Sequence, residues 1–365
     1  MTTLQLSDGR ALPVPGFGTW RCDPATLQPA IVAAIRAGFR HIDTGPYRNE
    51  ALVGAGIREA LSLGLIASRA DLFITGKLPA TCMDPAAVEP ALRKLLAELG
   101  TDYVDLYITH WPYALAPDST ASPPLPAARR GYSAEAYLAT WRAMEACVDA
   151  GLARALGCSN MTAAKLAALL PAARVRPVAV QNELHTALAQ PDLLRFAAAA
   201  GITLCGYCPL GSPGRPDLYR APGDPEVLGH PEVAAVAAAA GRTPAQVLLR
   251  WAIQRGTAPL PRSTNPARIV ENFGVHGWAL PPALMARLDA LDRTKGSEGR
   301  IMKVRAPAQG SGVLPGFLYP PSPTSLIARA HTAPPPLPRS PLQGDNFAPP
   351  SYADWRQVWD EDFTF

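Results

Sequence analysis

No stretch of this 365-residue chain approaches the roughly 18 consecutive apolar residues that a membrane-spanning helix needs. The opening segment also lacks the basic residues and apolar run of a secretory signal. These two absences predict a cytosolic protein with no membrane partner.

Charge is scarce as well. Only 18% of the residues are charged, and the net charge of +4 comes from positive residues scattered along the chain. A nucleic-acid-binding surface needs concentrated positive charge, so we expect a small-molecule partner and no nucleic acid. The 48% of apolar residues is enough to build a large core and argues against wholesale disorder.

Cysteine is infrequent and irregularly spaced, which in a long chain is typical of reduced intracellular thiols. Cys205 and Cys208 form a CxxC pair in a segment that otherwise resembles a buried strand. No second pair completes a zinc site, so we predict no metal and favour a structural role over a redox role. The six cysteines are Cys22, Cys82, Cys147, Cys158, Cys205 and Cys208.

Short β-rich runs alternate with Ala- and Leu-rich helical stretches. The eight runs span 17–20, 41–44, 71–77, 103–111, 153–160, 178–184, 202–209 and 258–263. The helical stretches span 27–37, 50–62, 85–99, 134–150, 162–170, 191–200, 231–240 with 243–254, and 266–273. Buried strands joined by helical crossovers are parallel, and eight such units close into a barrel. We therefore predict an α/β fold, a (β/α)8 TIM barrel that occupies residues 1–302 as one domain.

Three segments lie outside this alternation. The opening residues 4–17 place Ser-Asp-Gly between short apolar runs, which predicts a β-hairpin that plugs the lower end of the barrel. Residues 114–131, rich in Pro, Ala and Ser, and residues 211–229 are predicted to form loops over the rim of the barrel.

The segment 303–365 differs from the rest in composition. It carries 12 prolines between residues 307 and 350, which prevents a lasting helix or central strand. We predict an extended or disordered tail whose last residues, with two tryptophans and two phenylalanines, dock onto the body. An alternative is that the tail binds SH3-type or WW-type domains and recruits the protein to a partner.

Polar residues end seven of the eight β-rich runs. In a barrel of parallel strands the carboxyl ends converge on one rim, and active sites form there. We therefore expect these seven side chains to meet. They are Asp43, Lys77, His110, Asn160, Gln181, Tyr207 and Arg262.

The motifs that contain these residues follow one another in the order of a known family. They are Gly18-Thr19-Trp20, HIDT…YRNE, FITGK, THWP, GCSN, VQNELH, GYCPLGS and PRSTNPARIVEN. Over about residues 4–300 the chain resembles the aldo-keto reductase superfamily, and it is most similar to the aldehyde reductase and aldose reductase branch. The resemblance implies a usually monomeric enzyme that reduces a small-molecule carbonyl compound, an aldehyde or a ketone, with NADPH.

The resemblance also implies a catalytic set of Asp43, Tyr47, Lys77 and His110. Tyr47 would be the general acid, Lys77 would lower its pKa, and Asp43 would hold Lys77. A phenol titrates near 10 and a neighbouring ammonium stabilises phenolate, so this arrangement brings the acid closer to neutral pH. His110 would orient the substrate carbonyl.

Substrate and cofactor would share the rim. The implied substrate-binding residues are Trp20, Tyr47, His110 and Trp111, whose aromatic rings favour a hydrophobic carbonyl compound. The arginines and hydroxyl groups of residues 261–268 form an anion site suited to the 2′-phosphate of NADPH. The implied cofactor-binding residues are Gly18, Thr19, Trp20, Asp43, Ser159, Asn160, Gln181, Tyr207, Leu210, Gly211, Ser212, Pro261, Arg262, Ser263, Thr264, Arg268, Glu271 and Asn272.

One spacing departs from the family pattern. Tyr47 follows Asp43 by four positions, one fewer than in the family, and an ungapped comparison places Arg48 at the position of the acid. An arginine cannot give up a proton, so Arg48 could not replace the tyrosine. We predict that Tyr47 is the acid and that Gly45-Pro46 absorbs the deletion. The alternative is a catalytically impaired regulatory or sensor protein that binds NADP(H) without turnover.

Overall fold

Eight parallel strands form one curled sheet in the structure, a computed structural model that describes residues 2–116, 129–215, 217–220 and 222–293. The strands lie side by side in chain order, and each pairs in parallel with the next. They are β3 (Phe17–Gly18), β4 (His41–Asp43), β5 (Phe73–Leu78), β6 (Leu106–Thr109), β9 (Leu156–Ser159), β10 (Ala179–Glu183), β11 (Thr203–Tyr207) and β12 (Ala258–Pro259).

Two backbone hydrogen bonds join the first strand of this sheet to the segment of the last. The N–H groups of Gly16 and Gly18 donate to the carbonyl oxygens of Pro259 and Pro261, at 3.0 and 2.9 Å. The parallel order and these bonds agree with the predicted (β/α)8 barrel.

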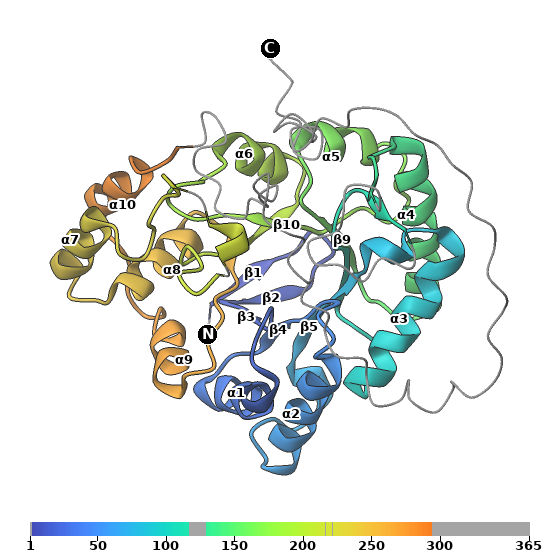
Figure 1. The fold of residues 1–365 in the computed structure, drawn as a ribbon, viewed down its shortest axis with the longest axis horizontal. Coiled ribbons are helices and arrows are strands. Elements are labelled where there is room, and N and C mark those ends of the chain that lie inside the picture. The colour runs from blue at the N-terminus through green and yellow to red at the C-terminus, as the bar shows by residue number, and fades with distance from the viewer. Residues whose placement is uncertain (1, 117–128, 216, 221, 294–365) are drawn as a thin grey trace, which may run out of the picture.

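Ten helices of the described residues surround the strands as a ring (Figure 1). Four helices, α2, α3, α7 and α9, have the predicted bounds, and α10 was not predicted. The helix α1 begins at Pro24, three residues before the predicted start, because the Asp23 side chain caps it and proline is favoured in the first turn. The helices of the described residues are α1 (Pro24–Ala37), α2 (Glu50–Ser62), α3 (Pro85–Leu99), α4 (Ala134–Asp149), α5 (Ala163–Leu169), α6 (Pro191–Ala199), α7 (Pro231–Ala240), α8 (Pro244–Gln254), α9 (Pro266–Phe273) and α10 (Pro282–Asp289), with short 3₁₀ turns η1 (Arg69–Asp71), η2 (Ala80–Cys82) and η4 (Asp217–Tyr219).

The predicted N-terminal hairpin is confirmed. Strands β1 (Thr2–Gln5) and β2 (Ala11–Val14) pair antiparallel. The apolar side chains Leu6, Leu12 and Val14 are buried in one cluster with residues that begin the barrel strands, among them Phe73 and Leu106. The hairpin therefore closes the amino-terminal end of the barrel and leaves the carboxyl-terminal end for the site.

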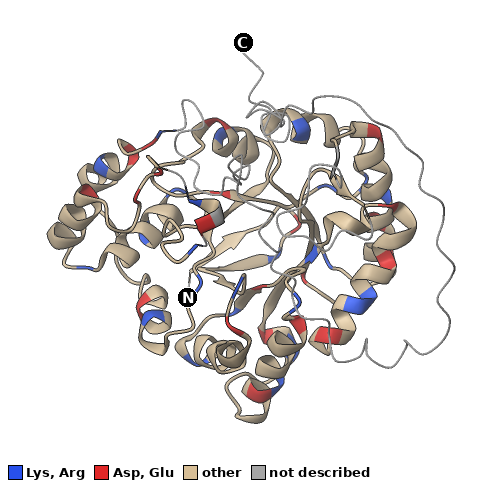
Figure 2. Ribbon diagram, in the orientation of Figure 1, with Lys and Arg blue, Asp and Glu red and all other residues tan. Residues whose placement is uncertain are grey.

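The main core lies between the strands and the ring of helices. Its largest fully buried side chains include Trp141 on α4 and Trp251 on α8. Charged residues of both signs are interspersed on the outer helices (Figure 2). None of the helices in the described ranges combines the length and apolarity that a membrane crossing requires.

The insertion after β6 begins and ends in a small ladder that the sequence did not reveal. Strand β7 (Ala114–Leu115) pairs antiparallel with β8 (Arg129–Arg130), so the two ends of this predicted rim loop lie together. The predicted domain boundary at residue 302 and the interpretations of the Pro-rich tail fall outside the described residues.

Candidate active site

A cavity of about 980 Å³ opens among the loops that follow the barrel strands. Side chains from almost every strand end contribute to its wall, together with the loop after β11 and the first turns of α9. This is the rim at which parallel barrels place their active sites. The wall divides into a buried ion pair, an aromatic region, an amide and hydroxyl cluster, and a basic end.

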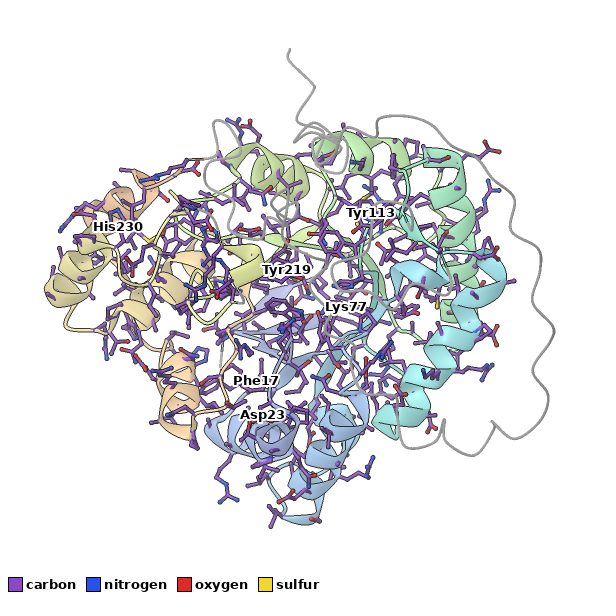
Figure 3. The ribbon with its side chains drawn as sticks, in the orientation of Figure 1. Phe17, Asp23, Lys77, Tyr113, Tyr219 and His230 are labelled. Atoms are coloured by element: carbon purple, nitrogen blue, oxygen red, sulfur yellow. The ribbon has the colours of Figure 1, made fainter. Side chains whose placement is uncertain are left out.

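The ion pair joins the last residue of β4 to an interior residue of β5. Lys77 Nζ lies 2.5 Å from Asp43 Oδ1 and 2.9 Å from the carbonyl oxygen of Thr44. The other carboxylate oxygen, Oδ2, accepts a hydrogen bond of 2.7 Å from Gln181 Nε2. Burial lowers the pKa of Lys77, and the Asp43 carboxylate opposes that shift. Figure 3 shows Lys77 near the centre of the ring of helices.

Tyr47 reaches the cavity from a tight turn between β4 and α2. Its backbone N–H donates to the carbonyl oxygen of Gly45 at 2.6 Å, which makes a three-residue γ-type turn centred on Pro46. Arg48 then adopts a left-handed conformation with φ of 60°. These two features shorten the path from Asp43, and they bring the Tyr47 ring to the cavity wall while Arg48 is exposed.

The phenol ring of Tyr47 lies between two other predicted site residues. Its centroid is 5.7 Å from that of the His110 ring, at an interplanar angle of 75°, and 5.4 Å from Lys77 Nζ. A Cβ atom on Gly45 would come within 2.8 Å of Tyr47 Cζ and 2.9 Å of Lys77 Cδ. Only glycine therefore leaves room for the phenol and the lysine stem to meet above residue 45.

His110 follows β6 directly and lies beside this phenol. Burial and the nearby charge of Lys77 lower the pKa of His110 to about 3. The imidazole is therefore neutral at physiological pH, with one nitrogen that donates a hydrogen bond and one that accepts.

A cluster of amide and hydroxyl groups continues from the ion pair along the wall. The Tyr207 hydroxyl donates to Asn160 Oδ1 at 2.9 Å, and Asn160 Nδ2 donates to the carbonyl oxygen of His110 at 2.9 Å. The Ser159 hydroxyl donates to the same carbonyl. Together with Gln181 these groups connect β6, β9, β10 and β11 at one level of the rim.

The loop after β11 crosses the cavity. It is held by Arg215, a buried residue whose guanidinium donates to the carbonyl oxygens of Gly211 and Tyr219 at 3.2 and 3.1 Å. The same guanidinium pairs with Asp224 Oδ2 at 2.8 Å. This internal bracing places the Tyr219 ring against Trp20, with centroids 6.1 Å apart, across the mouth of the cavity.

The far end of the cavity is basic. Exposed Arg262 and Arg268 line it, together with Ser263, Thr264 and the first turn of α9. Asn265 caps this helix by accepting from the N–H of Arg268 at 3.2 Å. The helix N-terminus adds partial positive charge to that of the two guanidinium groups.

Most residues that the sequence predicted for the site line this one cavity. The exceptions are Lys77, Thr19 and Gly211. Lys77 lies beneath the wall and is bonded to Asp43, whereas Thr19 is fully buried and donates to the Asp43 carbonyl oxygen at 3.0 Å. Gly211, with φ of 74°, forms the turn that begins the crossing loop.

Sequence reasoning missed several apolar wall residues, chiefly Tyr113, Leu115, Tyr219 and Leu228. Leu115, Tyr219 and Leu228 come from the two insertions that were predicted only as rim loops, and Tyr113 directly precedes the first of them. Aromatic residues inside Pro-rich rim loops were the available signal, but their orientation depends on the loop conformation. With Trp20 and Trp111 they add aromatic and aliphatic side chains to the cavity wall.

The CxxC pair has no partners for metal or redox chemistry. Cys205 is buried within β11, all six cysteines are free, and burial raises the pKa of Cys205 and Cys208 to about 12. Among the described residues, no group of three or more His, Cys, Asp or Glu side chains could hold a metal ion.

Comparison with known proteins identifies the family. The aldo/keto reductase family profile matches residues 15–293. Aldo-keto reductase family 1 member A1 of Bos taurus is 42% identical over 289 residues, which cover 79% of this chain and 88% of the relative. The aldose reductase of Schistosoma japonicum superposes with a TM-score of 0.72 at 33% identity and covers 80% of this chain and 92% of its own. The Bombyx mori aldo-keto reductase, solved in complex with NADP, gives a TM-score of 0.73 at 32% identity and covers 83% and 95%. The chain therefore belongs to the aldo/keto reductase family of NADP(H)-dependent oxidoreductases.

Proposed function

We propose that this protein uses NADPH to reduce aldehydes to alcohols, with ketones as a second class of substrate. Aldehyde reductases and NADP-dependent alcohol dehydrogenases carry out this reaction. The observation that carries the proposal is the position of Tyr47. Its ring lies in the cavity wall beside Lys77 and His110, although the turn that presents it is short.

The donor set along the cavity fits NADPH. The amide and hydroxyl groups of Ser159, Asn160 and Gln181 offer hydrogen bonds to a carboxamide, and Tyr207 offers an aromatic face to the ring beside it. The basic end offers charge-assisted hydrogen bonds to a phosphate monoester. The remaining contacts are proposed for Gly18, Thr19, Trp20, Asp43, Leu210, Gly211, Ser212, Pro261, Arg262, Ser263, Thr264, Arg268, Glu271 and Asn272.

When bound, NADPH supplies a hydride to the carbonyl carbon. Tyr47 gives a proton to the carbonyl oxygen as negative charge develops there. The Lys77 ammonium stabilises the resulting phenolate, and Asp43 with the Thr44 carbonyl keeps Lys77 in place. His110, neutral at physiological pH, donates a hydrogen bond that orients the carbonyl.

The walls around this centre favour a particular kind of substrate. Trp111 and Tyr113 continue the ring contacts from His110, and Trp20 and Tyr219 line the same cavity. Contact with these rings stabilises a hydrophobic or aromatic carbonyl compound more than a small hydrophilic one.

The alternative of an NADP(H)-binding sensor without turnover depends on a misplaced tyrosine. The short turn would support it if the phenol pointed away from the ion pair. The inward position of the ring and the exposed position of Arg48 support the reductase instead.

The direct test follows NADPH absorbance with a panel of aromatic and aliphatic aldehydes, while protein fluorescence measures NADPH and NADH binding. We expect turnover, with aromatic aldehydes preferred and NADPH bound more tightly than NADH. Tight NADPH binding without turnover of any aldehyde or ketone would instead establish the sensor.

Removal of the phenol oxygen separates chemistry from binding. We expect Tyr47→Phe to lower turnover by about 100-fold or more, because acid catalysis is typically worth that much. The Kd of NADPH should stay within about twofold, since the ring remains in place while only the proton donor is lost. Turnover like that of the wild type would show that another group delivers the proton.

A further inference from the structure

The turn that presents Tyr47 is not closed by its own helix cap. Asn49 occupies the N-cap position of α2, yet its side chain makes no capping hydrogen bond and donates instead to the carbonyl oxygen of Thr19 at 3.0 Å. The first N–H groups of the helix and of the preceding turn therefore need another acceptor. Glu50, the first residue of α2, provides it.

Glu50 folds back over the turn. Its Oε1 accepts a hydrogen bond of 2.9 Å from the backbone N–H of Tyr47. Burial raises the pKa of Glu50, and the backbone N–H groups of Glu50 itself, Tyr47 and Arg48 near the carboxylate oppose that shift. Glu50 is 5% exposed, and among the described residues no lysine or arginine forms an ion pair with it. Backbone N–H groups and the helix N-terminus are thus the partners of this buried carboxylate.

The position of the phenol depends on this backbone. The Tyr47 ring folds back above Gly45, within reach of the Lys77 stem, so a shift of the turn moves the ring directly. The turn contains a left-handed arginine, which costs conformational energy in a residue with a side chain. A strained turn keeps its shape only when its surroundings fix it.

We propose that Glu50 is a positioning residue for carbonyl reduction: its carboxylate gathers the backbone N–H groups of the short turn and fixes the Tyr47 phenol beside Lys77 and His110. This inference rests on the proposed role of Tyr47 as the proton donor. Glu50 itself does not touch the reacting atoms. Its contribution is geometric, so the reach of its side chain matters more than its charge.

Two substitutions of Glu50 test the length of its side chain and its charge separately. Glu50→Asp keeps the charge at the helix N-terminus but shortens the side chain by one methylene, so the carboxylate no longer reaches the N–H of Tyr47. We expect kcat to fall at least about 10-fold, since a misplacement of about 1 Å can cost 100-fold. Glu50→Gln keeps an oxygen acceptor at the same reach, and its kcat should stay within about threefold of the wild type. Both variants should bind NADPH with a Kd within about twofold, which also shows that they fold.

A matched control lies on the same helix. Glu59 hydrogen-bonds Gln28 Nε2 at 2.8 Å, away from the turn, so Glu59→Asp should leave kcat unchanged. In a Tyr47→Phe background, Glu50→Asp should cause no further loss of the residual turnover, because the group that it positions is absent.

Each outcome bears on one proposal. Three results would each overturn the positioning role of Glu50. The first is a wild-type kcat in Glu50→Asp, and the second is an equal loss of kcat in Glu50→Asp and Glu50→Gln. The third is a loss of kcat in Glu50→Asp that multiplies with the loss in Tyr47→Phe. If Tyr47→Phe alone turns over normally, the proposed proton donor is wrong, whatever Glu50 does.

Discussion

Strand β4 is three residues long, and its first and last side chains, His41 and Asp43, lie on the same side of the strand. His41 is at the end of the barrel that the N-terminal hairpin closes, and Asp43 is at the open rim. His41 is 1% exposed, and its Nε2 hydrogen-bonds Thr75 Oγ1 at 2.9 Å. Asp43 has Lys77 and Gln181 as partners.

The two ends of β4 differ in the charge that they support. Burial lowers the pKa of His41 to about 4, so the closed end holds a neutral group. The open end holds two opposite charges within 2.5 Å, with further hydrogen bonds to both. Burial alone excludes charge from the interior, and a charge is kept only where the strands supply a counter-charge and hydrogen bonds. In the proposed mechanism, the charges at the open end are the ones that proton donation by Tyr47 needs.

Removal of the Lys77 charge should have the largest effect on the open end of β4. We expect Lys77→Met to lower the free energy of unfolding by about 3–5 kcal/mol, because it leaves the Asp43 carboxylate buried and uncompensated. Chemical denaturation at neutral pH measures the loss. The double variant Asp43→Asn/Lys77→Met removes both charges and should recover much of the stability.

An exposed ion pair of equal length provides the control for that experiment. Arg10 Nη1 lies 2.5 Å from Asp8 Oδ2 in the hairpin turn, with side chains 38% and 23% exposed. Arg10→Met should change the free energy of unfolding by no more than about 1 kcal/mol. A similar loss in Arg10→Met and Lys77→Met would mean that burial does not govern the strength of these pairs.

Acidification should act on the closed end. The pKa of His41 is about 4 in the folded protein and near 6.5 in an unfolded chain, so below pH 6.5 the unfolded state binds the proton more readily. Stability is therefore lost as the pH falls from about 6.5 towards 4, and at pH 5 the loss from this group is about 2 kcal/mol. We expect His41→Gln to lose about that much less than the wild type between pH 7.5 and pH 5, as measured by denaturant unfolding.

The half-buried His230 is the comparison for this pH effect. Its side chain caps α7 by accepting from the N–H of Glu232, at the edge of the ring of helices (Figure 3). Because a protonated imidazole cannot accept this bond, His230→Gln measures what the loss of this cap adds to the acid response, separately from His41. An acid response that His41→Gln leaves intact would assign the loss to other groups, His110 first, whose pKa is also lowered.

Much of the open end was predictable because parallel strands bring their carboxyl ends together. Asp43, His110, Asn160, Gln181 and Tyr207 each lie at or near the carboxyl end of a β-rich run, and the topology alone places them on one rim. Lys77 was expected with them but lies just below the wall, whereas Gln181 lines the cavity although two more residues of β10 follow it. The position of a residue along its strand predicts at which end of the barrel it lies, but it does not predict which side chains the residue contacts.

The position of Tyr47 could not be derived in the same way. The sequence predicted a turn at Gly45-Pro46, but the position of the ring also depends on a left-handed Arg48 and on the reach of Glu50, and neither of these has a period or propensity that the sequence displays. Tyr219 was unpredictable for a similar reason, because it is placed by an arginine buried within its own loop. The position of a side chain on irregular backbone can be predicted only when the three-dimensional contacts of that backbone are known.

A substitution at the basic end of the cavity should have the smallest effect of these tests, and it should affect only one part of the cofactor. Arg268 is exposed and lies at the first turn of α9, so its removal should leave folding unchanged. We expect Arg268→Gln to raise the Kd of NADPH about 10-fold, which is about 1.4 kcal/mol, through the lost charge-assisted contact with the 2′-phosphate. NADH lacks that phosphate and should bind the variant and the wild type equally. Because the site is exposed, the difference should shrink as salt rises from about 0.05 to about 0.5 M, whereas the buried Asp43–Lys77 pair should hardly respond. Equal weakening of NADPH and NADH would place Arg268 at a part of the cofactor that both share, and the phosphate would then be held by Arg262 and the hydroxyl groups beside it.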